Sequence, residues 1–100
     1  MGRSRLELHA QLTDITPKVY YQPPNGLRME YPCIVYNKSD VLTLHAGNDK
    51  YRNTTRYTVT VIDRDPDSSI PESVLDLPLC SYDRRFAADN LNHDVFTLYF

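Results

Sequence analysis

Hydrophobic and polar side chains alternate with a period of two over residues 56–63, RYTVTVID. One face of an extended strand would carry Tyr57, Val59 and Val61, and the other face would carry Thr58, Thr60 and Ile62. Strict alternation of this kind is typical of a β-strand with two distinct faces. We therefore predict a strand over residues 56–63, and we expect it at the centre of a sheet.

Three further segments are rich in strand-forming residues. KVYYQ (18–22) is followed by the turn sequence PPNG, and YPCIVYN (31–37) is apolar enough at its centre to be buried on both faces. Pro32 must then lie at the start of that strand or on a sheet edge. The last quarter has two β-rich ends joined by ADNLN. His93 lies in the polar turn before the closing strand, in which Phe96, Leu98 and Phe100 alternate with Val95, Thr97 and Tyr99.

Two segments have helical spacing. Residues 5–15 place Leu6, His9 and Ala10 on one stripe, with Thr13 as an additional member and with Leu8, Leu12 and Ile15 beside it. Thr16-Pro17 ends the helix. Residues 69–77 begin with Ser69 and Glu72 in a capping-box spacing, and Pro78 stops them. Their apolar face would carry Ile70, Val74 and Leu75, with Leu77 as an additional member.

These elements predict one domain over residues 1–100, since a chain of this length supports a single core. The fold class we expect is α+β, with a mainly antiparallel β-sheet, an N-terminal helix, and one crossover helix packed on a face. Net charge is −2 and no apolar run approaches the roughly 18 residues that a membrane span needs. We therefore expect neither a membrane partner nor direct binding to nucleic acid.

The segment between Asn37 and Arg56 predicts a long polar hairpin. DVLTLHA alternates before the tip, and the tip contains Gly47 and Asn48. Hairpins of this length are uncommon unless they bind something, although a merely mobile loop is the simpler alternative. The candidate contact residues, for a second copy or another partner, are Gly47, Asn48, Asp49, Lys50, Tyr51 and Arg52.

Asp63, Asp65 and Asp67 alternate as carboxylates do at the head of a calcium-binding loop. Such a loop requires glycine at its sixth position and glutamate at its twelfth, and these positions hold Ser68 and Val74. We therefore predict a turn that leads into a capped helix, with no metal site.

No residue cluster predicts catalysis or a cofactor, so we expect a protein that is not an enzyme. Cys33 and Cys80 lie in apolar surroundings and should be buried, reduced thiols, and no nucleophile signature surrounds them. The run DRR (83–85) fits ordinary salt bridges better than an anion site, because acidic residues flank it. The one excess is tyrosine, with eight residues, which suits half-buried strands and contact surfaces.

The order of these segments resembles the tail-terminator (tail-completion) proteins of long-tailed bacteriophages and their prophage relatives. The resemblance covers about residues 5–100 and rests on VYYQPPNG, YPCIVYN, RYTVTVIDRDPDS and ADNLNHDVFTLYF. That family has an N-terminal helix, a strand, a YP-x-IVY-type strand, a long hairpin, a strand-to-helix crossover and a closing strand. Here the matching positions are 31–36, 56–63, 69–77 and 93–100.

The resemblance implies an architectural role in the virion tail, after assembly in the host cytoplasm. The expected partners are copies of the same chain in a ring, typically hexameric, together with the tail tube protein and the head–tail connector proteins. The ring would cap the tail tube and join it to the head. Two alternatives stay open: another small tail or neck protein, and a nucleic-acid-binding module.

Overall fold

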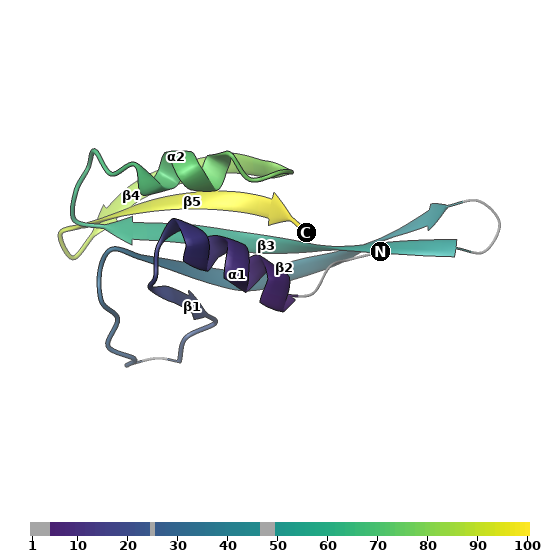
Figure 1. The fold of residues 1–100 in the computed structure, drawn as a ribbon, viewed down its shortest axis with the longest axis horizontal. Helices are drawn as coiled ribbons and strands as arrows, with labels where there is room; N and C mark the ends of the chain where they lie inside the picture. Colours follow the sequence, from purple (N-terminus) through teal and green to yellow (C-terminus); the bar gives the residue numbers. More distant parts are fainter. Residues whose placement is uncertain (1–4, 25, 47–49) are drawn as a thin grey trace.

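The computed structural model describes residues 5–24, 26–46 and 50–100. They form a sheet that carries two helices, and two of its strands run far beyond the rest (Figure 1). The elements, in chain order, are α1 (Arg5–Ile15), β1 (Val19–Tyr21), β2 (Cys33–Ala46), β3 (Lys50–Asp63), α2 (Ile70–Leu75), β4 (Cys80–Ala88) and β5 (Leu91–Tyr99).

The strands are arranged in the order β1-β2-β3-β5-β4. Only β1 and β2 are parallel, and the other three pairings are antiparallel. The predicted α+β class is therefore confirmed, and so is the central place of the strand over 56–63, which is the inner half of β3. Pro32 immediately precedes β2, as its missing N–H requires.

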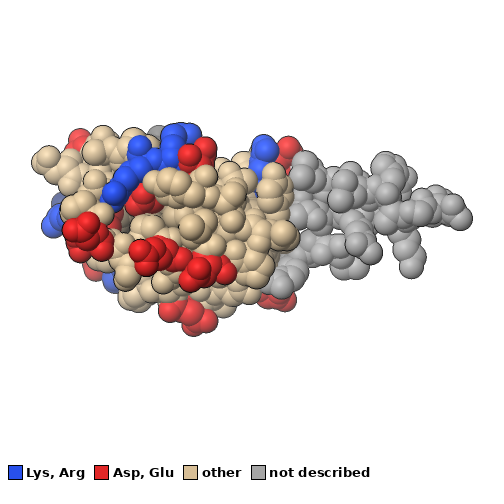
Figure 2. Space-filling model, turned by 90° about the horizontal axis from the view of Figure 1, so that it is seen from above, with Lys and Arg blue, Asp and Glu red and all other residues tan. Residues whose placement is uncertain are grey.

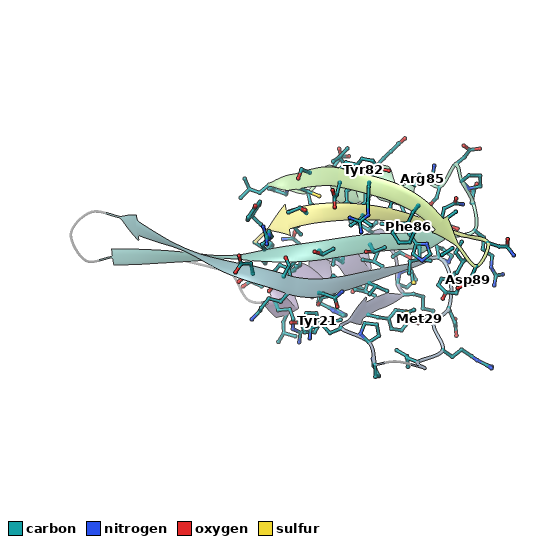
Figure 3. All side chains as sticks on the ribbon, turned by 180° about the vertical axis from the view of Figure 1, so that it is seen from behind. Tyr21, Met29, Tyr82, Arg85, Phe86 and Asp89 are labelled. Atoms are coloured by element: carbon teal, nitrogen blue, oxygen red, sulfur yellow. The ribbon has the colours of Figure 1, made fainter. Side chains whose placement is uncertain are left out.

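Both helices lie on the same face of the sheet (Figure 1). The core between them and the sheet consists of Leu8, Leu12, Ile34, Tyr36, Tyr57, Val59, Val61, Val74, Phe96 and Leu98. Tyr57, Val59 and Val61 share this face, which is the prediction from their alternation. No helix of the described residues covers the opposite face, seen in Figure 3, and we call it the open face.

The contact side of α1 differs from part of the predicted stripe. Leu8 and Leu12 are fully buried, whereas Leu6 is 66% exposed. Leu8 and Leu12 are four residues apart and therefore lie on one side of the helix, one turn above the other. The apolar residues of α1 cover a wide part of its surface, so the sequence did not determine which side of the helix faces the sheet. In the structure the side with Leu8 and Leu12 does.

The helix predicted over 69–77 is shorter and is capped differently. It spans Ile70–Leu75, and the side chain of Ser69, its N-cap residue, makes no capping hydrogen bond. The predicted capping box is therefore wrong. The preceding serine supplies the bond instead, because the Ile70 N–H donates to Ser68 Oγ at 3.3 Å.

The β4–β5 hairpin turns more tightly than the sequence predicted. Asp89 and Asn90 both have left-handed backbone conformations, with φ of 54° and 62°, and they form the whole connection. A two-residue turn with two positive φ values matches the twist of the flanking strands, and Asp and Asn tolerate it best after glycine. His93 consequently lies within β5, not in the turn as predicted.

Candidate functional site

A two-stranded ribbon projects from one end of the sheet (Figure 1). The pairing of β3 with β5 stops at Arg56 and Tyr99, and a backbone pair between Thr55 and Phe100 follows it, with N···O distances of 2.9 and 3.4 Å. Beyond this point β3 has only β2 as a partner, through the pairs from Val41 with Thr55 to Ala46 with Lys50. We call residues 41–46 and 50–54 the ribbon.

The predicted contact residues are partly placed by this arrangement. Lys50, Tyr51 and Arg52 belong to the outer end of β3 and pair in register with Ala46, His45 and Leu44. The other three predicted residues, 47–49, lie outside the described residues. The predicted long hairpin is thus confirmed as a pair of continuous 14-residue strands.

A β-bulge marks the base of the ribbon. The register of β2 shifts between Lys38 and Asp40, so Ser39 is the extra residue. Ser39 Oγ donates to the Arg56 carbonyl oxygen at 2.8 Å and accepts from Arg56 Nε at 3.3 Å. Arg56 also lies 3.7 Å from the Asp40 carboxylate. These contacts fix the point at which two strands leave the five-stranded body.

A shallow groove of about 270 Å³ lies between α2, β4 and β5, on the same side as the helices. Phe96, which is 1% exposed, contributes to its floor. Leu75 and Tyr82, which are 45% and 48% exposed, line it as well. The remaining lining residues are Pro66, Ser68, Pro71, Glu72, Arg85 and Asp94.

The polar end of the groove is a hydrogen-bonded network around Asp94. This residue is 6% exposed, and its Oδ1 accepts from the Tyr82 hydroxyl at 2.9 Å and lies 3.3 Å from Arg85 Nε. Arg85 Nη2 also donates to the Pro66 carbonyl oxygen at 2.8 Å. The network ties β4 to β5 and to the loop before α2, and it pairs the buried carboxylate with a cation, as burial requires.

A second bulge makes this network possible. Tyr82 pairs with Phe96, Arg84 with Val95 and Arg85 with Asp94, so Asp83 is an extra residue in β4. In a regular strand, residues three apart lie on opposite faces. The bulge restores Tyr82 and Arg85 to one face, where both reach Asp94, and it re-aims Arg84 onto the open face.

Tyr82 remains a hydrogen-bond donor at neutral pH. Desolvation raises the pKa of its phenol above 10.0, and the hydrogen bond to Asp94 and the charge of Asp94 raise this pKa further, against the opposing effect of Arg85. The phenol therefore keeps its proton and continues to donate to the carboxylate.

Sequence reasoning missed this network, although one signal for it was present. Asp94 is in phase with Phe96 and Leu98, which alternation places on the core side of the last strand. A carboxylate in a buried phase requires a cation or several donors nearby. The segment DRR was predicted to form ordinary salt bridges, and the structure shows Arg84 with Asp83 at 3.3 Å and Arg85 with Asp94. The bulge places the two arginines on opposite faces, so they do not form one anion site.

The alternating aspartates form successive turns. Asp63 Oδ1 accepts from the Asp65 N–H at 3.0 Å, and Asp65 Oδ1 accepts from the Asp67 N–H at 2.9 Å. Side-chain oxygens that bind the backbone two residues further on are typical of Asx turns. Within the part of the chain that the structure describes, no group of three acidic, histidine or cysteine side chains could hold a metal ion.

Both cysteines are free thiols. Burial raises the pKa of Cys33 from 9.0 to about 11, with a smaller contribution from Asp63, and burial raises that of Cys80 from 9.0 to about 11. Cys33 is fully buried, as predicted, whereas Cys80 is only partly buried at the start of β4. Neither thiol is present as the thiolate, the reactive form, at neutral pH.

Tyrosines form a cluster under α1. Arg5 Nη1 donates to the Tyr36 hydroxyl at 3.0 Å, and His9 Nδ1 lies 2.7 Å from the same oxygen. Tyr21 packs on Tyr36 with ring centroids 4.8 Å apart, and the Arg5 guanidinium lies 4.3 Å above the Tyr21 ring. Tyr36 and Tyr57 are buried, so part of the tyrosine excess belongs to the core and not to a contact surface.

The comparisons with known proteins leave the function to be argued from the residues and the fold. No protein-family model matches the sequence, and a search of curated proteins finds no significant match. Among the described residues, no helix has both the length and the apolar character needed to cross a membrane.

Proposed function

We propose that the protein is a structural component of the tail of a long-tailed bacteriophage, a tail-terminator (tail-completion) protein. In this role copies of the chain form a head-to-tail ring, typically hexameric, that caps the tail tube and joins it to the head connector. The chain acts as a building block, and its contacts are with copies of itself, with the tube protein and with the connector.

The ribbon is the observation that carries the proposal. A two-stranded hairpin is at best marginally stable in water, because each strand lacks a second neighbour and neither face is covered. The outer parts of β2 and β3 leave the body as a pair, so a contact with a partner would stabilise them. A contact between one end of a protomer and a different surface of the next is heterologous, and heterologous contacts that close form rings.

The order of elements supports the same proposal. An N-terminal helix, a short strand, a strand with the sequence YPCIVY, a long hairpin, a crossover helix and a closing strand follow one another in the order that the sequence resemblance implies. β4 is an additional strand that the resemblance did not place. The molecule measures 52 × 26 × 22 Å, so it is elongated along the ribbon.

A shortened ribbon tests the proposal. In the variant, an Asn-Gly turn replaces residues 43–53 and joins Leu42 to its partner Thr54. It is produced in place of the native chain in the phage or prophage that encodes it, and the particles are examined by electron microscopy. Overlong tails, or tails not joined to heads, are expected.

The control variant is Leu27→Ser. Leu27 is 44% exposed in the loop between β1 and β2, away from the ribbon, so this variant should give normal particles. Normal tails joined to heads in the shortened variant would overturn the proposal. So would the absence of the chain from purified particles by mass spectrometry.

A nucleic-acid-binding module is the second candidate, and one observation favours it. Phe86 and His93 stack at 4.6 Å with ring planes 8° apart, and the Arg84 guanidinium lies 5.8 Å from the Phe86 ring. Aromatic rings beside a cation can stack bases of a single strand. Binding of single-stranded DNA that weakens steeply with salt and is lost in Phe86→Ala would support this candidate over the tail protein.

A further inference from the structure

We propose that the groove between α2 and β4 receives the ribbon of a second copy of this chain. The inference rests on the proposed function and identifies the two surfaces that meet at each ring contact. The ribbon is the inserting element, and the groove over Phe96 is the surface that accepts it.

The groove has the chemistry of a contact surface with an apolar centre. Phe96 contributes to a buried floor, and the half-exposed Leu75 and Tyr82 lie beside it. Leu75 is on the partly solvated side of α2, whose other side supplies Val74 to the core. Aromatic and aliphatic side chains that water only partly covers, with a polar rim around them, are typical of the centre of a protein interface.

Charge complementarity selects the occupant. Arg85 and Asp94 neutralise one another, which leaves Glu72 as the remaining charge among the lining residues. Asp65, Asp67 and Asp76 in the loop and at the end of the helix are also exposed, and Arg64 is the exposed cation of that loop, so the balance there is acidic. Viewed from above, acidic side chains gather along the lower side of the picture, which is the helix side of the molecule, and most basic side chains lie along the upper edge (Figure 2).

The outer part of the ribbon has the opposite balance. Lys50 and Arg52 flank Tyr51 at the start of β3, and within the six predicted contact residues Asp49 is the single acidic residue. A strand end whose sequence carries two cations and an aromatic residue matches, in charge and in apolar character, a groove with an apolar floor and an acidic rim. Such complementary charges favour the correct partner and its register.

The positions of the two surfaces require a second molecule. The ribbon projects from one end of the long axis, and Arg85 in the groove lies toward the other end (Figure 3). β2 and β3 run without interruption from the body into the ribbon, so the ribbon cannot fold back onto its own groove. The contact is therefore between different surfaces of two copies, which is the geometry of a ring.

The outer edge of β4 is a less suitable site for the ribbon. The bulge at Asp83 interrupts its hydrogen-bonding pattern, and Arg84 and Arg85 follow directly. Bulges and charges are the features by which edge strands resist pairing with another strand. The groove beside this edge offers apolar surface, and the charge of Arg85, which lines it, is paired with Asp94.

Photo-crosslinking tests the contact directly. Tyr51 is replaced by p-benzoylphenylalanine in the purified full chain, and equal amounts of ¹⁴N- and ¹⁵N-labelled protein are mixed at micromolar to millimolar concentration and irradiated. Mixed-isotope crosslinks from position 51 to residues 66–85 or 94–96 are expected. The same probe at Leu27 should give no crosslink to these residues.

A charge exchange provides the second test. Glu72→Arg alone, and Lys50→Glu with Arg52→Glu, should each weaken self-association by about tenfold or more in sedimentation equilibrium. The three changes together should restore it to within about threefold of the native chain, because the opposite charges again face one another. Asp14→Arg on the exposed side of α1 makes the same change of charge as Glu72→Arg and should have no such effect.

The outcomes separate this inference from the proposed function. Rings whose crosslinks lie outside residues 66–85 and 94–96, or charge variants that do not rescue one another, overturn the inference and leave the ring proposal standing. Groove crosslinks in a chain that is absent from virions overturn the proposed function and leave the contact standing. A chain that stays monomeric throughout the concentration range overturns the inference.

Discussion

The two halves of β3 differ in the number of neighbours that each half has. Arg56–Asp63 lies between β2 and β5, and three of its residues, Tyr57, Val59 and Val61, pack under the helices. Among the strands that the structure describes, Lys50–Thr54 pairs with β2 alone. One continuous strand thus passes from the centre of a sheet to a ribbon at its end.

This difference indicates that the stability of the fold arises in the body, and that the ribbon is expected to contribute little to it. Burial of apolar surface is the main favourable contribution to folding, and the core residues that the structure describes belong to the inner half of the sheet and to the helices. A variant in the body should therefore destabilise the fold, whereas a variant in the ribbon should affect assembly. Five measurements test this distinction.

Phe96→Ala should have the largest effect. Phe96 is 1% exposed, and its ring contacts that of Tyr82 with centroids 5.3 Å apart. Removal of a buried phenyl ring leaves a cavity, and it should lower the free energy of unfolding by about 3–5 kcal/mol in urea titration. Thr97→Ala, on the open face of the same strand, is the control and should cost much less.

Val59→Ala should be the next largest. Val59 is fully buried in the central strand, and loss of its two methyl groups should cost on the order of 1–3 kcal/mol. The same titration checks it, with Thr58→Ala on the opposite face for comparison. Equal costs for the two variants would contradict the assignment of the buried face.

Alkaline pH should destabilise the body through Cys33. Burial raises the pKa of this thiol from 9.0 to about 11, so the unfolded chain releases the proton at lower pH than the folded chain. The stabilising contribution is therefore complete below pH 9 and is lost as pH rises toward 11. It is on the order of 1–2 kcal/mol.

Urea titrations at pH 8, 9 and 10 measure this effect. Cys33→Ala should lose less stability over that interval than the native chain does, because other titrating groups are common to both. If the two chains lose the same amount, the Cys33 thiol does not account for the pH dependence.

Tyr82→Phe should have a smaller effect, at the boundary between the body and the groove. The change removes the hydroxyl that donates to Asp94, while the ion pair with Arg85 remains. The cost should be about 1 kcal/mol, the usual contribution of one hydrogen bond. Tyr99→Phe serves as the matched control. A cost above that of Val59→Ala would mean that the network stabilises the fold as much as the core does.

The shortened ribbon, with Asn-Gly in place of residues 43–53, should have the smallest effect on stability. We expect the free energy of unfolding of the isolated chain to change by no more than about 0.5 kcal/mol, because the outer part of β3 pairs with β2 alone among the described strands. A loss as large as that of Val59→Ala would show that the ribbon and the body form one cooperative unit.

The elements that the sequence predicted well are those with strong local signals. The alternation over 56–63 gave the buried face of β3 correctly, and Thr16-Pro17 marked the end of α1 at Ile15. The fold class followed from the order of these segments. Each of these signals depends on residues close together in the chain.

The features that the sequence did not predict depend on contacts between distant segments. The bulges at Ser39 and Asp83 change which side chains of β2 and β4 face the core. Neither serine nor aspartate at these positions predicts a bulge from the sequence. The Asp94 network depends on the second bulge, so it could not be derived from alternation. The parallel pairing of β1 with β2 follows from the path of the chain between them, and this path has no periodic pattern.

The elongated shape has a consequence for hydrodynamic measurements. The longest dimension of the molecule, 52 Å, is twice the next, 26 Å, and its radius of gyration of 14.6 Å exceeds the roughly 13 Å of a compact chain of this length. Such a particle diffuses more slowly than a sphere of equal mass and leaves a gel-filtration column early. A monomer would thus elute as though it were larger, so the oligomeric state has to be determined by light scattering or sedimentation equilibrium, which measure mass independently of shape.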